Sequence, residues 1–139
     1  MTDYCTQADL EARFGAQEIL ELTDRNGDNV ADAGVLENAI ADAGAVIDTF
    51  VAKRYDLPLA EVPPALVKTA CDIARYNLHG DLPTTTVAEN FKYAMTFLRD
   101  IAAGKAVLDI AGTEPAGAEN EILIGGPDRM FTSDSLKDY

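Results

Sequence analysis

The residues with the clearest potential for chemistry form an acidic loop between Thr23 and Asp32. Asp24, Asn26 and Asp28 occupy the first, third and fifth positions of a calcium-binding loop, and Asp32 occupies the ninth. Calcium prefers oxygen ligands, which carboxylate and amide side chains at alternate loop positions supply. The spacing therefore predicts a metal site made of these four side chains.

Two positions depart from the calcium-loop pattern. The sixth position is Asn29 in place of Gly, although Asn tolerates a left-handed backbone. The twelfth position is Val35, which cannot ligate, in place of a bidentate Glu, and Glu37 comes two residues too late. Asx turns that cap the start of the following helix are the alternative interpretation. The pattern favours this capping role, and any calcium site is predicted to be weak.

The sequence contains no other constellation of chemically active residues. It has no Gly-rich phosphate loop, no cluster of His and Cys with metal spacing, and no nucleophilic triad. Cys5 and Cys71 are interpreted as reduced thiols, with Cys71 buried in a helical core. His79, the only histidine, is interpreted as a residue at a helix end. We therefore predict a protein that is not an enzyme and requires no cofactor.

The composition is that of one acidic globular domain. The 139 residues are 47% hydrophobic, which is sufficient for one core. No apolar run approaches the ~20 residues of a membrane span, and the first residues lack the features of a signal peptide. The net charge of −13 argues against a protein that grips DNA with a basic patch. It suits either simple solubility or a surface that stays near DNA without binding it.

The longest periodic stretch, from Asp32 to Arg54, predicts a long helix. Its apolar residues recur at helical spacing, and they are Leu36, Ile40, Ala43, Ile47 and Phe50. A proline-bounded connection follows, and Pro63-Pro64 begins a helix that runs to His79. Apolar residues cover more than half of that helix's circumference, which predicts a central position.

Three further helices complete the predicted fold. Thr6 begins a helix with a capping box and Gly15 ends it, and a short helix from Ala16 to Leu22 follows. The last helix starts within 84–86 and ends at Gly104. We predict an all-α fold, a small bundle of about five helices around the long central helix, with residues 1–105 as the helical domain.

Residues 106–139 are predicted to be an extended C-terminal tail. Val107–Ile110 and Glu121–Ile124 are candidate strands of a short hairpin. Ordering such a segment costs roughly 1–2 kcal/mol per residue, so it is expected to order on a neighbouring protein. The apolar anchors predicted for that interface are Ile122, Ile124, Met130, Phe131 and Tyr139.

Several segments resemble the Mu-like phage and prophage neck family. The most specific is Arg54-Tyr55-Asp56-Leu57-Pro58-Leu59. The other segments extend over nearly the whole chain, and they are Tyr4-Cys5-Thr6, Asp9-Leu10, Arg13-Phe14-Gly15, Leu22-Thr23-Asp24, Ala52-Lys53, Pro63-Pro64, Cys71 to Tyr76, Phe97 to Lys105 and Arg129 to Tyr139.

The resemblance implies a structural virion protein, assembled in the bacterial host cytoplasm. Members look like head-to-tail connectors of tailed phages, small helical proteins that form a homo-oligomeric ring below the portal protein. The implied partners are the portal protein and tail or neck proteins. DNA is expected to pass through without specific binding, and no membrane is involved. The alternative function is a calcium-responsive helical binding module that uses the loop from Asp24 to Asp32.

Overall fold

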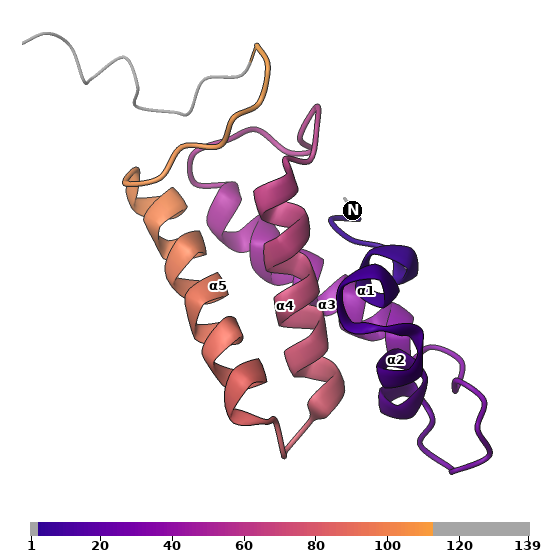
Figure 1. Ribbon diagram of the computed structural model, residues 1–139. Helices are drawn as coiled ribbons and strands as arrows, with labels where there is room; N and C mark the ends of the chain where they lie inside the picture. The colour runs from indigo at the N-terminus through magenta and orange to yellow at the C-terminus, as the bar shows by residue number, and fades with distance from the viewer. Residues whose placement is uncertain (1–2, 113–139) are drawn as a thin grey trace, which may run out of the picture.

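The computed structural model describes residues 3–112 and contains five α-helices. They are α1 (Gln7–Phe14), α2 (Ala16–Thr23), α3 (Val35–Val51), α4 (Pro64–His79) and α5 (Thr85–Ala103), as Figure 1 shows. No strand occurs within this described part of the chain. The predicted all-α fold of five helices is confirmed.

Helix α4 is in contact with each of the other four helices. It packs between α3 and α5, and α1 and α2 lie against it on the side away from α5 (Figure 1). Helices α4 and α5 run antiparallel and are joined by a short turn at residues 80–84. The largest fully buried side chains include Ile47, Leu66, Ile73, Leu98 and Ile101. The predicted central position of α4 is thus confirmed.

Helix α3 is shorter than the stretch predicted from Asp32 to Arg54. It covers 17 residues, from Val35 to Val51, and is therefore about 26 Å long. It starts late because Gly34 has a left-handed backbone, with a φ of 83°, which a right-handed helix does not contain. The carboxylate of Asp32 belongs to the preceding loop, where it accepts the backbone N–H of Arg25 at 2.7 Å. The other end turns tightly, since the N–H of Arg54 donates to the carbonyl of Val51.

The ends of the other helices follow their sequence signals. The capping box of α1 is present: Thr6 Oγ1 accepts from the Asp9 N–H at 3.3 Å, and Asp9 accepts from the Thr6 N–H at 2.9 Å. Thr84 caps α5 through the N–H of Val87. Pro64 stands at the first position of α4, as predicted. These caps place the helices within a residue of their predicted starts.

Residues 107–110, predicted as a strand, have no strand conformation. Leu108 and Ile110 are buried in the helical core, while Val107 is 66% exposed. This alternation produced the strand-like pattern. The N–H of Leu108 donates to the side-chain hydroxyl of Tyr55 at 2.8 Å in place of another strand. The core thus extends beyond Lys105, and the candidate strand at 121–124 lies outside the described residues.

Candidate functional site

The acidic loop is organised around the carboxylate of Asp24. Its Oδ1 accepts the backbone N–H of Gly27 at 2.7 Å and that of Asp28 at 3.2 Å, and its Oδ2 accepts the N–H of Asn29 at 2.8 Å. Asn29 has a φ of 63°, the left-handed conformation that Asn tolerates. A side chain that accepts three backbone hydrogen bonds fixes the path of the loop.

The remaining loop side chains also bind loop N–H groups. Asn26 accepts the N–H of Asp28 at 2.9 Å, and Asp28 accepts the N–H of Val30 at 3.0 Å, so each forms an Asx turn. The carboxylate of Asp32 accepts from the side-chain amide of Asn26 at 3.1 Å. The predicted Asx turns are confirmed. Their predicted role as a cap of α3 is wrong, because α3 begins after Gly34 without a side-chain cap.

The four predicted calcium ligands all lie in the loop between α2 and α3. Within residues 3–112, no group of three or more His, Cys, Asp or Glu side chains is arranged to hold a metal ion. Val35, at the twelfth position, is the first residue of α3. A calcium site made of Asp24, Asn26, Asp28 and Asp32 stays a prediction, and weak affinity is what this donor set supports.

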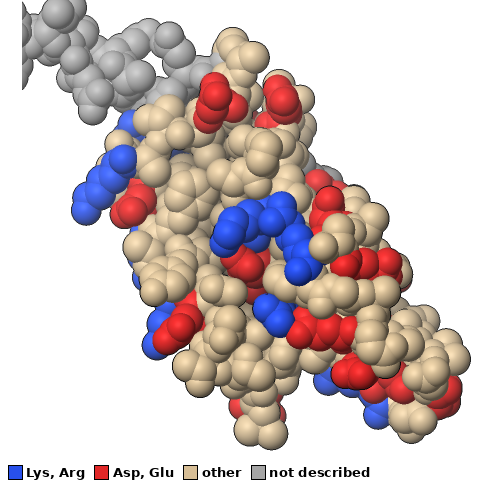
Figure 2. All heavy atoms as spheres, viewed as in Figure 1, with Lys and Arg blue, Asp and Glu red and all other residues tan. Residues whose placement is uncertain are grey.

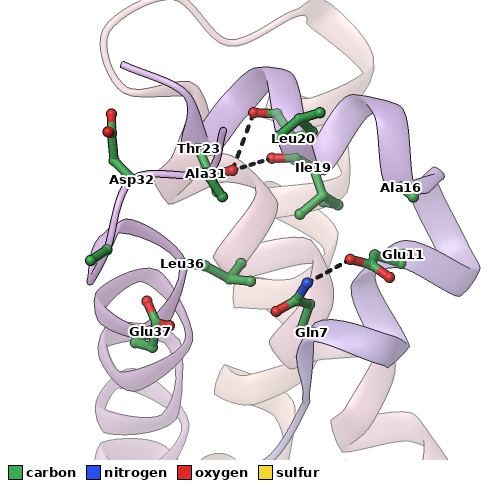
Figure 3. Close-up of a pocket in the computed structure, with 11 residues that line it drawn as sticks. Gln7, Glu11, Ala16, Ile19, Leu20, Thr23, Ala31, Asp32, Leu36 and Glu37 are labelled. Carbon is green, nitrogen blue, oxygen red and sulfur yellow. Dashed lines mark hydrogen bonds between the residues drawn. The ribbon is translucent and has the colours of Figure 1, made fainter. Parts of the chain in front are cut away.

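A small cavity lies between this loop and helices α1, α2 and α3 (Figure 3). Its volume is about 160 Å³, and its lining includes three acidic residues, Glu11, Asp32 and Glu37. The hydroxyl of Thr23 is not free to donate to a ligand, because it already donates to the carbonyl of Ile19 at 2.7 Å. This volume is below the roughly 300–1,000 Å³ of typical small-molecule sites.

Both cysteines are buried, as predicted for Cys71 in the helical core. Cys5 and Cys71 are both free and at most 3% exposed. The Cys5 thiol donates a hydrogen bond to Cys71, and this bond together with burial raises the pKa of Cys5 well above its usual value. Cys5, protonated and buried, is therefore a poor nucleophile. His79 lies at the end of α4, where its Nδ1 is 2.9 Å from the carbonyl oxygen of Arg75.

A shallow groove on the outer surface of α4 and α5 was not predicted. Its volume is about 260 Å³, and it is lined by Ala65, Lys68, Thr69, Tyr93 and Phe97. Tyr93 is 70% exposed. The signal was available, because Tyr93 follows Phe91 by two residues and must point to a different side of the helix.

Acidic side chains are scattered from one end to the other of the face seen in Figure 2, with basic side chains between them. Two ion pairs occur within the described residues. Arg75 binds Glu18 through two hydrogen bonds of 3.0 and 2.7 Å, which link α4 to α2, and Lys68 binds Asp72 at 2.7 Å. None of the helices in residues 3–112 has the length and apolar character needed to cross a membrane.

Residues 4–124 match the family model described as Bacteriophage Mu, Gp36. The chain belongs to the bacteriophage Mu Gp36 family. Gene product J of Escherichia phage Mu is 32% identical over 123 residues, which cover 88% of this chain and 87% of the phage protein. The Mu-like prophage FluMu protein gp36 of Haemophilus influenzae is 28% identical over 109 residues, or 78% and 77% of the two chains.

The Mu-like phage and prophage family predicted from the sequence is thus confirmed. The part of the chain that matches the Mu Gp36 family includes the acidic loop and the groove. The predicted interface residues Ile122, Ile124, Met130, Phe131 and Tyr139 lie outside the residues that the structure describes.

Proposed function

We propose that this protein is a structural virion component, a head-to-tail connector subunit. It assembles as a homo-oligomeric ring below the portal protein and joins the head to tail or neck proteins. The observation that carries the proposal is the family match over residues 4–124, with relatives from a phage and a Mu-like prophage. This role assigns no catalytic residue and no cofactor, and it places the protein in the virion after assembly in the host cytoplasm.

The chain offers two candidate surfaces for the contacts of a ring. A ring requires heterologous contacts, in which one surface of each subunit meets a different surface of the next. The α4/α5 groove, with Tyr93 70% exposed, is a candidate for one surface. The apolar residues predicted as tail anchors, Phe131 among them, are candidates for the other.

The negative charge fits passage of DNA through such a ring. A net charge of −13 repels phosphate groups, so DNA in contact with the channel does not adhere to it. The protein is expected to show no measurable binding to duplex DNA, even at about 50 mM salt where phosphate contacts are strong. Tight duplex binding under these conditions would contradict the proposed role.

Electron microscopy of the purified chain mixed with its cognate portal protein tests the proposal directly. The expected result is a ring of extra density below the portal, absent from portal alone. Mass spectrometry of purified virions should also detect the chain. A portal that stays bare at saturating concentrations of the chain, together with virions that lack it, would refute the connector function.

The acidic loop favours a second candidate, a calcium-responsive helical binding module. Its support is the placement of Asp24, Asn26 and Asp28 at alternate loop positions and the left-handed backbone of Asn29. A protein of this kind would bind calcium tightly and change its affinity for a partner when it does so. Calorimetric titration with calcium separates this candidate from a connector.

A further inference from the structure

The floor of the α4/α5 groove is apolar although it contains a threonine. Ala65 and Thr69 lie one turn apart on α4, and the Thr69 hydroxyl donates to the carbonyl of Ala65 at 2.8 Å. That hydrogen bond satisfies the hydroxyl within the helix. On α5, Tyr93 and Phe97 lie one turn apart and form the aromatic wall. The groove therefore offers an apolar surface for an aromatic or aliphatic side chain.

A positive charge stands at the edge of this surface. Lys68 is bound to Asp72 at 2.7 Å, yet its side chain is 64% exposed while that of Asp72 is 7% exposed. A lysine ammonium has three N–H donors, and Asp72 takes one of them. The others are able to bind a carboxylate that arrives with the occupant. An apolar segment with acidic neighbours fits the groove.

Residues 113–139 of the chain have this chemistry. Met130-Phe131 is an apolar pair with Asp128 and Asp134 on either side. The segment holds six acidic residues against two basic ones, a net charge of −4. The segment therefore matches the groove in two ways: its negative charge suits Lys68, and its apolar pair suits the apolar surface.

The chain leaves the described domain at the end where the groove lies. The groove residues of α4 belong to its first two turns and Phe97 to the last turns of α5, so both are within about 10 Å of that end. Figure 1 shows the residues after α5 leaving there. Residues 113–131 span up to about 60 Å when extended. This length is about twice the ~28 Å of α5, so the segment is long enough to reach a neighbouring copy.

We propose that this groove binds the C-terminal segment of a neighbouring copy of the chain, with Phe131 against Tyr93 and Phe97. Asp128 or Asp134 then faces Lys68. The inference rests on the proposed function, since the ring supplies the neighbouring copy. It assigns the two surfaces that a heterologous contact requires, because each subunit gives a segment to one neighbour and receives one from the other.

Photo-crosslinking of the full chain tests the inference. Benzoylphenylalanine replaces Phe131, and equal amounts of isotopically heavy and ordinary chain are mixed with the portal protein and irradiated. Mass spectrometry is expected to find crosslinks from position 131 to peptides that contain Thr69, Tyr93 or Phe97. These crosslinks should include pairs of one heavy and one ordinary chain.

Two variants control for the identity of the groove. Tyr93→Ala should lower the yield of these crosslinks severalfold without unfolding the domain, because the side chain is 70% exposed. Val30→Ala, at a 61% exposed apolar residue of the acidic loop, should leave the yield unchanged. Equal yields from the two variants would overturn the inference. So would crosslinks to other surfaces, or crosslinks only between peptides of the same isotope, which indicate that each groove holds its own tail.

The outcome is distinguishable from failure of the connector function. If microscopy shows the ring below the portal but the crosslinks avoid the groove, the docking site is wrong and the connector function stands. If heavy and ordinary chains are crosslinked at the groove but no ring forms on the portal, the docking site stands and the connector function is wrong.

Discussion

The backbone N–H of Leu108 donates a 2.8 Å hydrogen bond to the side-chain hydroxyl of Tyr55, 53 residues earlier in the chain. Both residues are 4% exposed. The bond joins the connection after α3 to the segment after α5, and it does so where water does not reach. It therefore fixes the point from which the C-terminal segment leaves the helical domain.

Tyr55→Phe removes the acceptor and leaves the N–H of Leu108 buried without a partner. The expected loss is about 1–3 kcal/mol of unfolding free energy, the usual penalty for such a group. Urea denaturation measures it. Tyr93→Phe is the matched control, since that hydroxyl belongs to a side chain that is 70% exposed, and it should change stability very little. Equal effects of the two substitutions would mean that the buried hydrogen bond does not stabilise the domain.

Gly104 ends α5 against the side chain of Arg54. Its φ is +78°, and a Cβ at this position would lie 2.9 Å from both Nη1 and Nη2 of Arg54. Gly112 has a similar φ of +73° but nothing within 4 Å of its Cβ position. Gly112→Ala should therefore lower the free energy of unfolding by only about 1–2 kcal/mol, the cost of a left-handed backbone at alanine. Gly104→Ala should lower it by more, because the new Cβ also meets Arg54.

A double-mutant cycle identifies the source of the difference. If the Arg54 guanidinium causes the additional loss, the effects of Gly104→Ala and Arg54→Ala are not additive, and the double variant is more stable than their sum predicts. Denaturant midpoints of the four proteins give the coupling free energy. Additive effects would assign the whole loss at Gly104 to its backbone conformation.

The helix boundaries that the sequence predicted well are those with local signals. Pro64 and Gly80 bound α4, and the reciprocal hydrogen bonds of Thr6 and Asp9 start α1. These interactions involve residues within one turn of the helix end, so spacing alone reveals them. The family was also predictable, because its characteristic segments are distributed over the whole chain.

The features that the sequence did not reveal depend on distant residues. The strand expected at 107–110 is absent because the partner of Leu108 is a tyrosine hydroxyl 53 residues away. The α4/α5 groove requires α4 to place Ala65 and Thr69 beside Tyr93, a relationship between two helices that periodicity along one helix does not contain.

The acidic loop is expected to hold its shape without a metal ion. Asp24→Ala removes the acceptor of three backbone N–H groups, those of Gly27, Asp28 and Asn29. These three amides should then exchange with solvent faster, which hydrogen-exchange NMR in the presence of a calcium chelator measures. Asp81→Ala, at an exposed acid after α4, is the control and should leave the three rates unchanged.

Calcium binding at this loop is expected to be no tighter than about 10⁻⁴ M, the affinity of weak calcium modules. Val35 supplies no bidentate carboxylate, and the carboxylate of Asp24 already accepts backbone hydrogen bonds. Isothermal titration calorimetry measures the affinity. Submicromolar binding that disappears when Asp24→Ala and Asp28→Ala are combined would favour the calcium-responsive module over the connector.

Alkaline pH is expected to destabilise the protein through Tyr4. This side chain is 2% exposed and its hydroxyl donates to the carboxylate of Asp48 on α3. Burial, followed by the hydrogen bond and the charge of Asp48, raises the pKa of Tyr4 above the usual 10.0. The folded protein then holds this proton at a pH where the unfolded chain has lost it.

The sign follows from that difference in bound protons. Tyr4 contributes full stability below about pH 10, and the contribution is lost as pH rises from there toward the higher pKa of the folded state, by up to ~1.4 kcal/mol per pH unit. Tyr4→Phe should therefore be less stable at pH 7, because Asp48 loses its donor, but should show a shallower decline above pH 10. Urea midpoints of both proteins from pH 7 to 11 measure the two slopes. Parallel declines would show that Tyr4 does not keep its proton in the folded domain.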